Sequence, residues 1–283
     1  MAVTMSNQTH LSNADERIIN SVFDPENSPD SPSVTIDTTL PSDSKVHDSA
    51  RLKQLQKAEL GAVRLVEQFS VESTSAPNIQ LSNKSTDIPQ AQSENSRKHE
   101  VYLRALELLT ALIAENPDYA SAYNNRAQLR RWRYENALLD LSLKDEQLEE
   151  ARVATIKDLE TAIALASPPE TQASVSPAQA KLLSQAWTQR GAVFWGITKR
   201  AGSLQPAQKS TPAAAPTPKQ DEDVPDWQTW DNSRLEEEGS RSFFMAGMYG
   251  SEIGRNLAVR TNPYARLCAG IVKEAMRSEF APM

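Results

Sequence analysis

Residues 116–127 read NPDYASAYNNRA, and this stretch decides the fold. Pro117, Tyr123 and Ala127 follow one another at spacings of six and then four residues. A proline ends a helix because it lacks an N–H group and clashes with the preceding turn. An aromatic residue early in the next helix, with a small residue one turn later, then lets a partner helix approach closely. The stretch therefore predicts the junction between two helix pairs.

A matching second helix follows at residues 158–162, which read DLETA. Leu159 and Ala162 lie three residues apart, on one helix face, and Pro168 ends the helix. This order of aromatic, small and proline positions is typical of the tetratricopeptide repeat, a helix–turn–helix unit of about 34 residues. One such pair cannot bury its own apolar face, so about three copies are needed for a stable stack.

Two further copies can be read on either side once long loops are allowed. We therefore predict an all-α chain of three tetratricopeptide helix pairs that form a short α-solenoid with C-terminal capping helices. The alternative is an unrelated helical bundle, because every amphipathic helix repeats near 3.6 residues. The upstream copy uses Gly61 as its small residue, with Ala105, Leu109 and Leu112; the downstream copy uses Trp187, Gly191 and Phe194, then Gly239, Phe243 and Ala246.

The predicted boundaries follow the polar and proline-rich stretches. Residues 1–49 are expected to be mostly disordered, with a short helix over 14–23. The repeat domain covers 50–249, and capping helices cover 250–283, with Asn262-Pro263 at the start of the last one. The repeats span 50–117 with a loop at 70–96, 118–167 with lengthened helices and Asp145 as a helix N-cap, and 178–249 with a loop at 202–231.

Composition and charge narrow the class of protein. The net charge of -7 argues against nucleic-acid binding, which needs clustered Lys and Arg. The basic cluster of Arg126, Arg130, Arg131 and Arg133 is interpreted mainly as a solvated helix face. One cysteine, Cys268, fits a reducing compartment and is expected to be a small buried residue. No apolar run approaches 18 residues, so we expect no membrane span and a cytoplasmic protein, with nuclear entry left open.

The side-chain inventory argues against an enzyme. The three histidines, His10, His47 and His99, all lie in or beside segments expected to be disordered, where no preorganised base or metal site is expected. The chain has no phosphate-binding loop, zinc-protease helix or nucleophile elbow. We therefore expect no catalytic residue, no metal and no cofactor.

The order of motifs along the chain resembles the tetratricopeptide repeat protein 36 family. The resemblance covers all three repeats and both ends, and it implies a small non-enzymatic adaptor with ties to chaperones and to tyrosine metabolism. Long inserts at 70–96, 134–151 and 202–230 depart from the compact animal members, and they indicate a fungal or other divergent relative. The likeness is carried by Val22-Phe23-Asp24-Pro25, by residues 121–128 (SAYNNRAQ), by Gln189-Arg190-Gly191 and by residues 262–268 (NPYARLC).

Chaperone binding can be compared with tetratricopeptide domains that hold acidic C-terminal tails in a five-residue carboxylate clamp. Only the repeat-two asparagine is matched, and the fixed cations are missing. A charge-assisted hydrogen bond contributes about 1.5 to 3 kcal/mol, so such a clamp would be weak here. By this resemblance the five positions are Ala58 and Ala62 in repeat one, Asn125 in repeat two, and Gln185 and Gln189 in repeat three.

The first helices of repeats two and three are expected to present amides and aromatics on a concave face. Such a groove suits an extended peptide or a helix of a partner protein. Asn124 is expected to bond a neighbouring helix rather than a ligand, and Asn125 to face the groove. The predicted groove residues are Ser121, Asn124, Asn125, Gln128, Trp132, Gln185, Thr188, Gln189 and Trp195.

These observations favour a monomeric adaptor that holds a segment of a protein partner, either an Hsp70-type chaperone or a metabolic enzyme. One rival is a co-chaperone of the Hsp70 and Hsp90 type. The other is a regulatory subunit of a metabolic enzyme that acts through its loops. Trp227 and Trp230, beside acidic residues 221–223, are either a docking motif or a strap over the third repeat.

Overall fold

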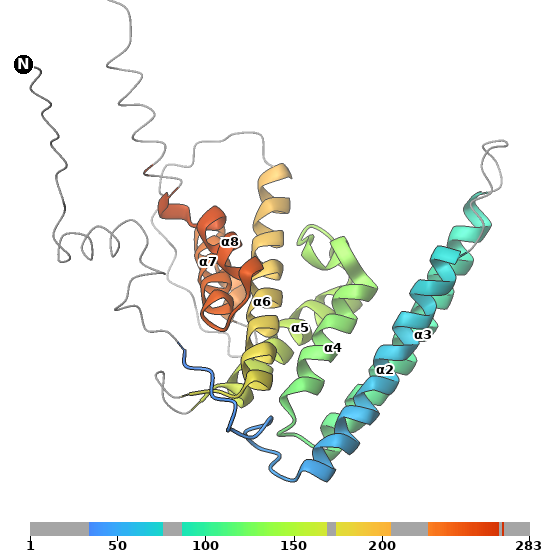
Figure 1. Ribbon diagram of the computed structural model, residues 1–283. Helices are drawn as coiled ribbons and strands as arrows, with labels where there is room; N and C mark the ends of the chain where they lie inside the picture. The colour runs from blue at the N-terminus through green and yellow to red at the C-terminus, as the bar shows by residue number, and fades with distance from the viewer. Residues whose placement is uncertain (1–33, 76–86, 169–173, 205–225, 266–267, 269–283) are drawn as a thin grey trace, which may run out of the picture.

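The computed structural model describes residues 34–75, 87–168, 174–204, 226–265 and 268 (Figure 1). The described part is all-α, as the sequence predicts: it contains helices and no β-strand beyond an isolated bridge. The expected helix at 14–23 lies outside the described residues. The helices are α2 (Ser49–Ser75), α3 (Asp87–Glu115), α4 (Ala120–Tyr134), α5 (Glu146–Ala166), α6 (Pro177–Leu204), α7 (Asn232–Met248) and α8 (Glu252–Thr261), with 3-10 helices η1 (Glu135–Leu139) and η2 (Asp226–Thr229).

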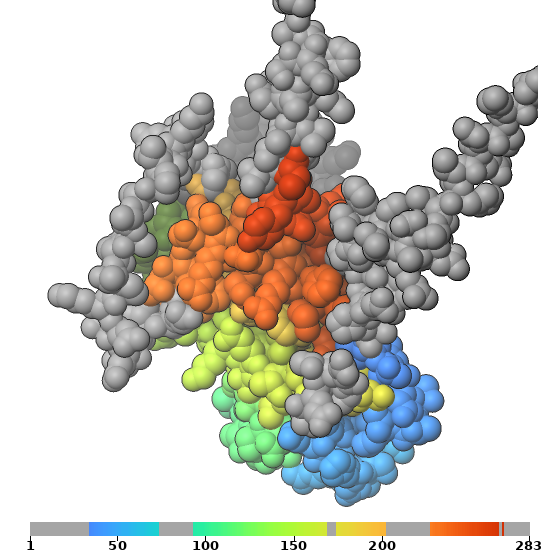
Figure 2. Space-filling view, turned by 90° about the vertical axis from the view of Figure 1, so that its left-hand side faces the viewer, coloured from blue at the N-terminus to red at the C-terminus, as the bar shows by residue number. Residues whose placement is uncertain are grey.

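The helices pack in chain order. Each one lies mainly against its predecessor and its successor, from α2 and α3 at one side of Figure 1 to α6, α7 and α8 at the other. Some contacts skip a helix: α4 also touches α6, and α6 also touches α8. Figure 2 shows α7 and α8 together on one face of the molecule. The even-numbered helices α2, α4 and α6 therefore succeed one another across the molecule.

The junction between α3 and α4 is built as the opening stretch predicts. Asn116 ends α3, and its side-chain amide donates to the carbonyl of Leu112 at 3.1 Å. The Tyr123 hydroxyl donates to the carbonyl of Pro117 at 3.1 Å. Ala127 is fully buried, where α4 meets Leu159 and the rest of the central core. The aromatic residue fixes the entry to α4, and the small residue allows the close packing.

The third pair shows why a glycine is needed at its contact. A Cβ added to Gly191 would lie 2.8 Å from the Phe243 ring and 3.0 Å from the carbonyl oxygen of Gly239. Phe194 and Phe243 are almost completely buried beside this crossing. The small position predicted for α6 is therefore real, and it sets how closely α6 and α7 approach.

The residue predicted to be the small helix-contact residue of α2, Gly61, is wrong by one position. Gly61 is exposed, and a Cβ added there would meet nothing within 4 Å. Ala62 is buried instead and packs with Tyr102, Ala105 and Leu109 of α3. The helix therefore presents Leu55, Ala62 and Phe69 to its partner, and every assignment counted from Gly61 shifts by one position.

Both helices of the first pair extend into the stretch predicted as loop. The prediction ended the first helix at Phe69 and began the second at Arg97, whereas α2 continues to Ser75 and α3 begins at Asp87. An ion pair between Arg97 and Glu72, at 2.6 Å, links these additional turns. The loop at 70–96 was predicted because this stretch is polar. Polar residues are equally suited to the exposed face of a helix.

Residues 34–48, expected to belong to a disordered segment, are packed across the molecule. Ile36 forms a parallel bridge with Val175, and the amide of Asp37 donates to the carbonyl of Val175 at 2.9 Å. The hydroxyl of Ser44 donates to the carbonyl of Leu165 at 3.3 Å. This segment therefore covers the connection between α5 and α6.

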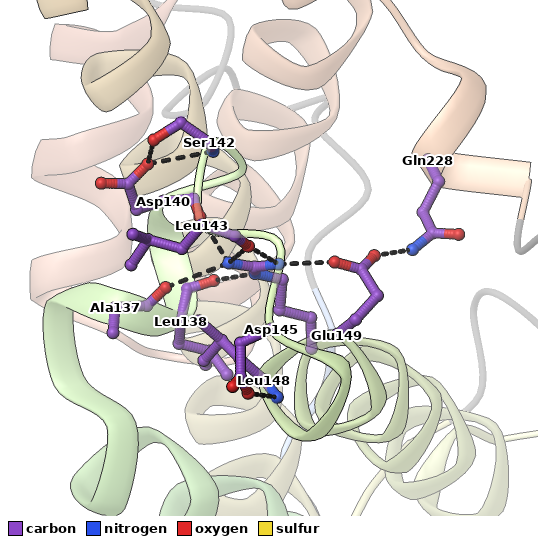
Figure 3. A network of polar contacts seen from close by, with 10 residues as sticks. Ala137, Leu138, Asp140, Ser142, Leu143, Asp145, Leu148, Glu149 and Gln228 are labelled. Carbon is purple, nitrogen blue, oxygen red and sulfur yellow. Dashed lines mark hydrogen bonds and ion pairs between the residues drawn. The ribbon is translucent and has the colours of Figure 1, made fainter.

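The extra residues of the second pair lengthen its helices in part, as predicted, because α5 has 21 residues; the others lie between α4 and α5. They form η1 and a turn that surround the buried guanidinium of Arg152 (Figure 3). Arg152 donates to the carbonyls of Leu138, at 3.0 Å, and of Ala137 and Leu143. Asp145 is the N-cap of α5, as predicted, and accepts from the amide of Leu148 at 2.9 Å. The side chain of Arg152 thus holds η1 and the following turn together through hydrogen bonds to their carbonyl groups.

Trp227 and Trp230 form a strap over α6 rather than a free docking motif. Trp227 is 5% exposed, and its ring centroid lies 6.2 Å from that of Phe194. Trp230 lies 5.6 Å from the same ring. Gln228, between them, donates to Glu149 of α5 (Figure 3). The end of the long loop is therefore part of the core.

The C-terminal end begins as predicted and then leaves the described residues. Ser251 is the N-cap of α8 and accepts from the amide of Gly254 at 3.0 Å. Asn262 accepts from the amide of Tyr264 at 2.9 Å, which is the geometry of a second helix start at Pro263. Cys268 is exposed, so its assignment as a buried residue is wrong.

Candidate functional site

Two adjoining hollows lie along α2, α4 and α6. We call the first the apolar hollow and the second the amide hollow; Gln128 of α4 lines both, so the two adjoin at this residue, and we refer to the pair as the groove. The apolar hollow is lined by Ala62, Val63, Val66, Glu67, Ala105, Leu109, Asn125, Gln128, Leu129 and Trp132. The amide hollow is lined by Gln128, Arg131, Ser184, Gln185, Thr188, Gln189, Ser251 and Ile253.

Glu59 joins α2 to the start of α4 beside the apolar hollow. Its carboxylate accepts hydrogen bonds of 2.7 Å from the Tyr119 hydroxyl, the Ser121 hydroxyl and the Asn125 amide. Glu59 is 7% exposed, and burial raises the pKa of its carboxyl group although the three donors oppose that rise. Burial and the neighbouring carboxylate also raise the pKa of Tyr119. Ser121 and Asn125 are therefore held by the protein itself.

The position of Glu59 corrects the comparison with the carboxylate clamp. Because the small residue of α2 is Ala62, the first clamp position moves from Ala58 to Glu59, and the second moves from Ala62 to Val63. A buried carboxylate thus stands where a lysine would be needed, and an apolar side chain stands where an amide would be. By this comparison, the first pair offers an acidic tail neither a cation nor an amide at these two positions.

A second polar link joins α4 to α6 at the floor of the amide hollow. The side-chain amide of Gln189 donates to Asn124 at 2.9 Å, and its oxygen accepts from Arg131 at 3.2 Å. Asn124 is 2% exposed, so it bonds a neighbouring helix, whereas Asn125 lines the apolar hollow. Thr188 donates to the carbonyl of Ser184 and lies 3.3 Å from the hydroxyl of Ser251.

The two predicted groove tryptophans are placed differently. Trp132 lines the apolar hollow, where Phe69 meets its ring edge-on at 5.7 Å and the Lys98 ammonium lies 5.0 Å from its centroid. Trp195 lines neither hollow, and the Lys199 ammonium lies 3.9 Å from its ring. The structure therefore brings Trp132 to the groove with the amides and leaves Trp195 outside it.

The basic cluster of α4 is not a solvated face. Arg126 and Arg130 both bind Asp158 of α5, at 2.7 Å and 2.5 Å. Asp158 is 4% exposed and Arg130 is 9% exposed, so this ion-pair group is part of the core between the two helices. Arg133 faces the other way, toward His99 and Asn95 of α3. Of this cluster, Arg131 lines the amide hollow, whereas Arg130 lines a separate hollow between α3 and α5.

A metal site would need several His, Cys, Asp or Glu side chains close together among the described residues. Within them, no three His, Cys, Asp or Glu side chains are gathered in a way that could hold a metal ion. His99 lies on α3 and stacks with Tyr102, so it is not beside a disordered segment as expected, whereas His47 is exposed. None of the helices in this part of the chain combines the length and apolarity needed to cross a membrane.

Sequence reasoning missed the α2 side of the groove and misjudged Arg131. A readable signal for α2 existed, because one helical stripe repeats at steps of three and four residues and passes through Ala62 rather than Gly61. For Arg131 no comparable local signal exists, since its position depends on α6. The stripe consists of Leu55, Glu59, Ala62, Val66 and Phe69.

Comparison with known proteins gives one informative relative. The chain is 33% identical over 276 residues to the L-tyrosine degradation gene cluster protein hmgX of Aspergillus fumigatus, and the match covers 95% of this chain and 93% of that protein. The chain belongs to the hmgX family. No protein-family model matches the chain, and no solved structure matches it. Nearly full coverage means that the similarity extends over the helices that line the groove.

Proposed function

We propose that this member of the hmgX family is a non-enzymatic adaptor whose groove binds a segment of a partner protein. The observation that carries the proposal is the groove itself: two hollows on successive helices that share Gln128. Its lining combines an aromatic anchor, Trp132, with amides that can bond a peptide backbone. An extended peptide or a helix fits such a surface better than a small substrate does.

The architecture supports this proposal if the three helix pairs form a tetratricopeptide-like α-solenoid. The consecutive packing and the α4–α6 contact suit such a stack, in which the first helix of each pair lines one face. The close crossing at Gly191 and the buried Ala127 suit the small positions of the repeat. Protein binding on the face of the first helices is then the expected use.

The partner that we propose is an enzyme of tyrosine degradation, met in the cytoplasm by a monomer of this chain. The support is the relative's name, which ties that protein to an L-tyrosine degradation gene cluster. An Hsp70-type or Hsp90-type co-chaperone is a weaker candidate, because Glu59 and Val63 occupy clamp positions that would need a cation and an amide.

Co-purification with a matched pair of variants tests the groove. Each tyrosine-degradation enzyme of the source organism would be expressed with the tagged full chain, as wild type, Val63→Lys or Leu60→Lys. Val63 lines the apolar hollow, whereas Leu60 is 41% exposed on the same helix and lines neither hollow. We expect one enzyme to be retained by wild type and by Leu60→Lys and lost with Val63→Lys.

The rival functions predict other outcomes in the same experiment. A regulatory subunit that acts through its loops would keep its enzyme with Val63→Lys and lose it when residues 205–225 are deleted, a deletion that spares the Trp227 strap. A co-chaperone would bind a peptide with an acidic chaperone C-terminus, and we expect no such binding. Retention of the enzyme by both lysine variants would contradict the groove proposal.

A further inference from the structure

Arg131 differs from its neighbours on α4 in having no carboxylate partner. Arg126 and Arg130 share Asp158, and each lies within 2.7 Å of it. Among the described residues, the acceptor of Arg131 is the neutral oxygen of Gln189, at 3.2 Å, and no acidic side chain there forms an ion pair with it. Arg126 and Arg130 therefore share one carboxylate, whereas the guanidinium of Arg131 stays without an anion within the groove.

This arrangement is costly unless a ligand completes it. A guanidinium has more N–H donors than the single Gln189 oxygen can satisfy. Partial burial of an unpaired charge is unfavourable, and the same burial lowers the pKa of Arg131. A carboxylate is the partner that matches the planar fork of a guanidinium, often through two parallel hydrogen bonds.

The surroundings of Arg131 admit a carboxylate and would bond its remaining lone pairs. The amide hollow contains no acidic lining residue, and its other polar groups are neutral amides and hydroxyls, among them Gln185, Thr188 and Ser251. The acidic lining residue of the two hollows, Glu67, lies at the other end of the groove, and the nearby Glu59 is already bonded to three donors. The groove is therefore acidic and apolar beside α2 and cationic beside α6.

We propose that Arg131 binds the side-chain carboxylate of an aspartate or glutamate in an extended partner segment whose apolar side chain occupies the apolar hollow at Trp132. Gln128 lies between the two contacts and lines both hollows, so one segment can reach both. This inference rests on the proposed function, because it takes the groove as the binding surface, and it adds the chemistry and the direction of the bound segment.

The test is a selection from random twelve-residue peptides displayed in a surface loop of a carrier protein, with the full wild-type chain immobilised. Since the variable segment has no free carboxyl end, only side-chain carboxylates are offered. We expect enrichment of Asp or Glu at one fixed spacing from an apolar residue. The consensus would then be made as an acetylated, amidated peptide, and its dissociation constant measured by fluorescence anisotropy.

Matched variants separate the charge from the fold. Arg131→Gln should weaken binding about tenfold or more, the range of a lost charge-assisted hydrogen bond. Arg104→Gln, on an exposed arginine of α3 that lines neither hollow, should change it less than about twofold. Replacing the peptide acid by its amide should weaken binding to wild type by the same factor and cause no further loss with Arg131→Gln. Circular dichroism checks that both variants fold.

Other outcomes would overturn the inference at different levels. If the binding of the selected peptides depends on Trp132 but not on Arg131, the carboxylate site is refuted and the groove proposal stands. If neither Trp132→Ala nor Arg131→Gln changes the affinity for the selected peptides, both the carboxylate site and the groove proposal are refuted. If a peptide binds only when its C-terminus is free, the site recognises a terminal carboxylate rather than the carboxylate of an acidic side chain. If deleting residues 205–225, which include Asp221 and Glu222, raises peptide affinity tenfold, the chain's own acidic segment is the occupant.

Discussion

Glu59 shows how a single side chain both joins two helices and sets the character of the groove. Three hydroxyl and amide donors from α4 converge on its carboxylate, each at 2.7 Å. Burial raises the pKa of this group above its ordinary value of 4.5. The folded protein therefore binds the Glu59 proton more tightly than the unfolded chain does.

A pH-dependent stability difference follows from that raised pKa. Protonation of Glu59 stabilises the fold at pH values below 4.5, and this contribution is lost as the pH rises through the raised pKa. The free energy of unfolding of wild type, minus that of Glu59→Gln, should therefore be larger at pH 4.5 than at pH 7.5. Urea unfolding at both values measures it, with exposed Glu100→Gln as control. A flat or reversed difference would contradict the burial argument.

Asp158 is the second residue on which the helices depend. It is the shared ion-pair partner of Arg126 and Arg130 within the core, so Asp158→Asn would leave two guanidinium groups without an anion. Removing one partner of a buried ion pair costs about 3 to 5 kcal/mol. We expect a loss of that order by urea unfolding, against less than about 0.5 kcal/mol for exposed Asp118→Asn. Equal losses would show that the cluster is solvated after all.

At the scale of the helix, two glycines with the same appearance in sequence have opposite roles. Gly61 lies in the exposed interior of α2, and alanine there should raise stability by about 0.5 to 1 kcal/mol, because glycine is a poor helix former. Gly191 lies at the α6–α7 crossing, and alanine there should lower stability by about 1 to 3 kcal/mol through overpacking against Phe243. Thermal unfolding compares the two. Destabilisation by both would restore the original assignment of Gly61.

The Trp227 strap makes a further prediction at this scale. Trp227 is 5% exposed, so Trp227→Ala should lower the free energy of unfolding by about 3 to 5 kcal/mol. A tryptophan that served only as a docking motif would cost nothing when removed. Tyr264→Ala, at an aromatic residue that is 63% exposed, is the control. Denaturant titration of both variants decides between strap and docking motif.

The sequence was informative where a signal is local and less so where partners are distant. The order from Pro117 to Ala127 correctly located the start of α4, because the spacing of proline, aromatic and small residues is fixed within a turn or two. The same logic failed at Gly61, where the identity of the residue outweighed the stripe that runs through Ala62. A stripe records packing directly, whereas a glycine can equally lie on an exposed face.

The same difference between local signals and distant partners explains why only part of the groove on α4 and α6 could be predicted. Asn125, Gln128 and Trp132 recur at steps of three and four residues, so their shared face could be read. Arg126 and Arg131 look alike in sequence, yet one meets Asp158 and the other meets Gln189, and these partners lie far along the chain. Only packing of α4 against both α5 and α6 distinguishes the two arginines.

At the scale of the whole molecule, helices packed in chain order produce a binding surface from distant segments. Glu59 and Asn125 are joined across the first step, and Asn124 and Gln189 across the second. The strap and residues 34–48 pack against other parts of the stack, over α6 and over the α5–α6 connection. The positions of α2, α4 and α6 along the groove are consequently fixed by a side-chain hydrogen bond at each step.

The most direct test of the central claim is photo-cross-linking from the groove. A benzophenone amino acid would be placed in the full chain at Gln128, which lines both hollows, and separately at Arg104, and each chain illuminated with the tyrosine-degradation enzymes of the source organism. Mass spectrometry should find one continuous segment of one enzyme cross-linked from position 128 and not from position 104. Cross-links to that enzyme from position 104 alone would contradict the account.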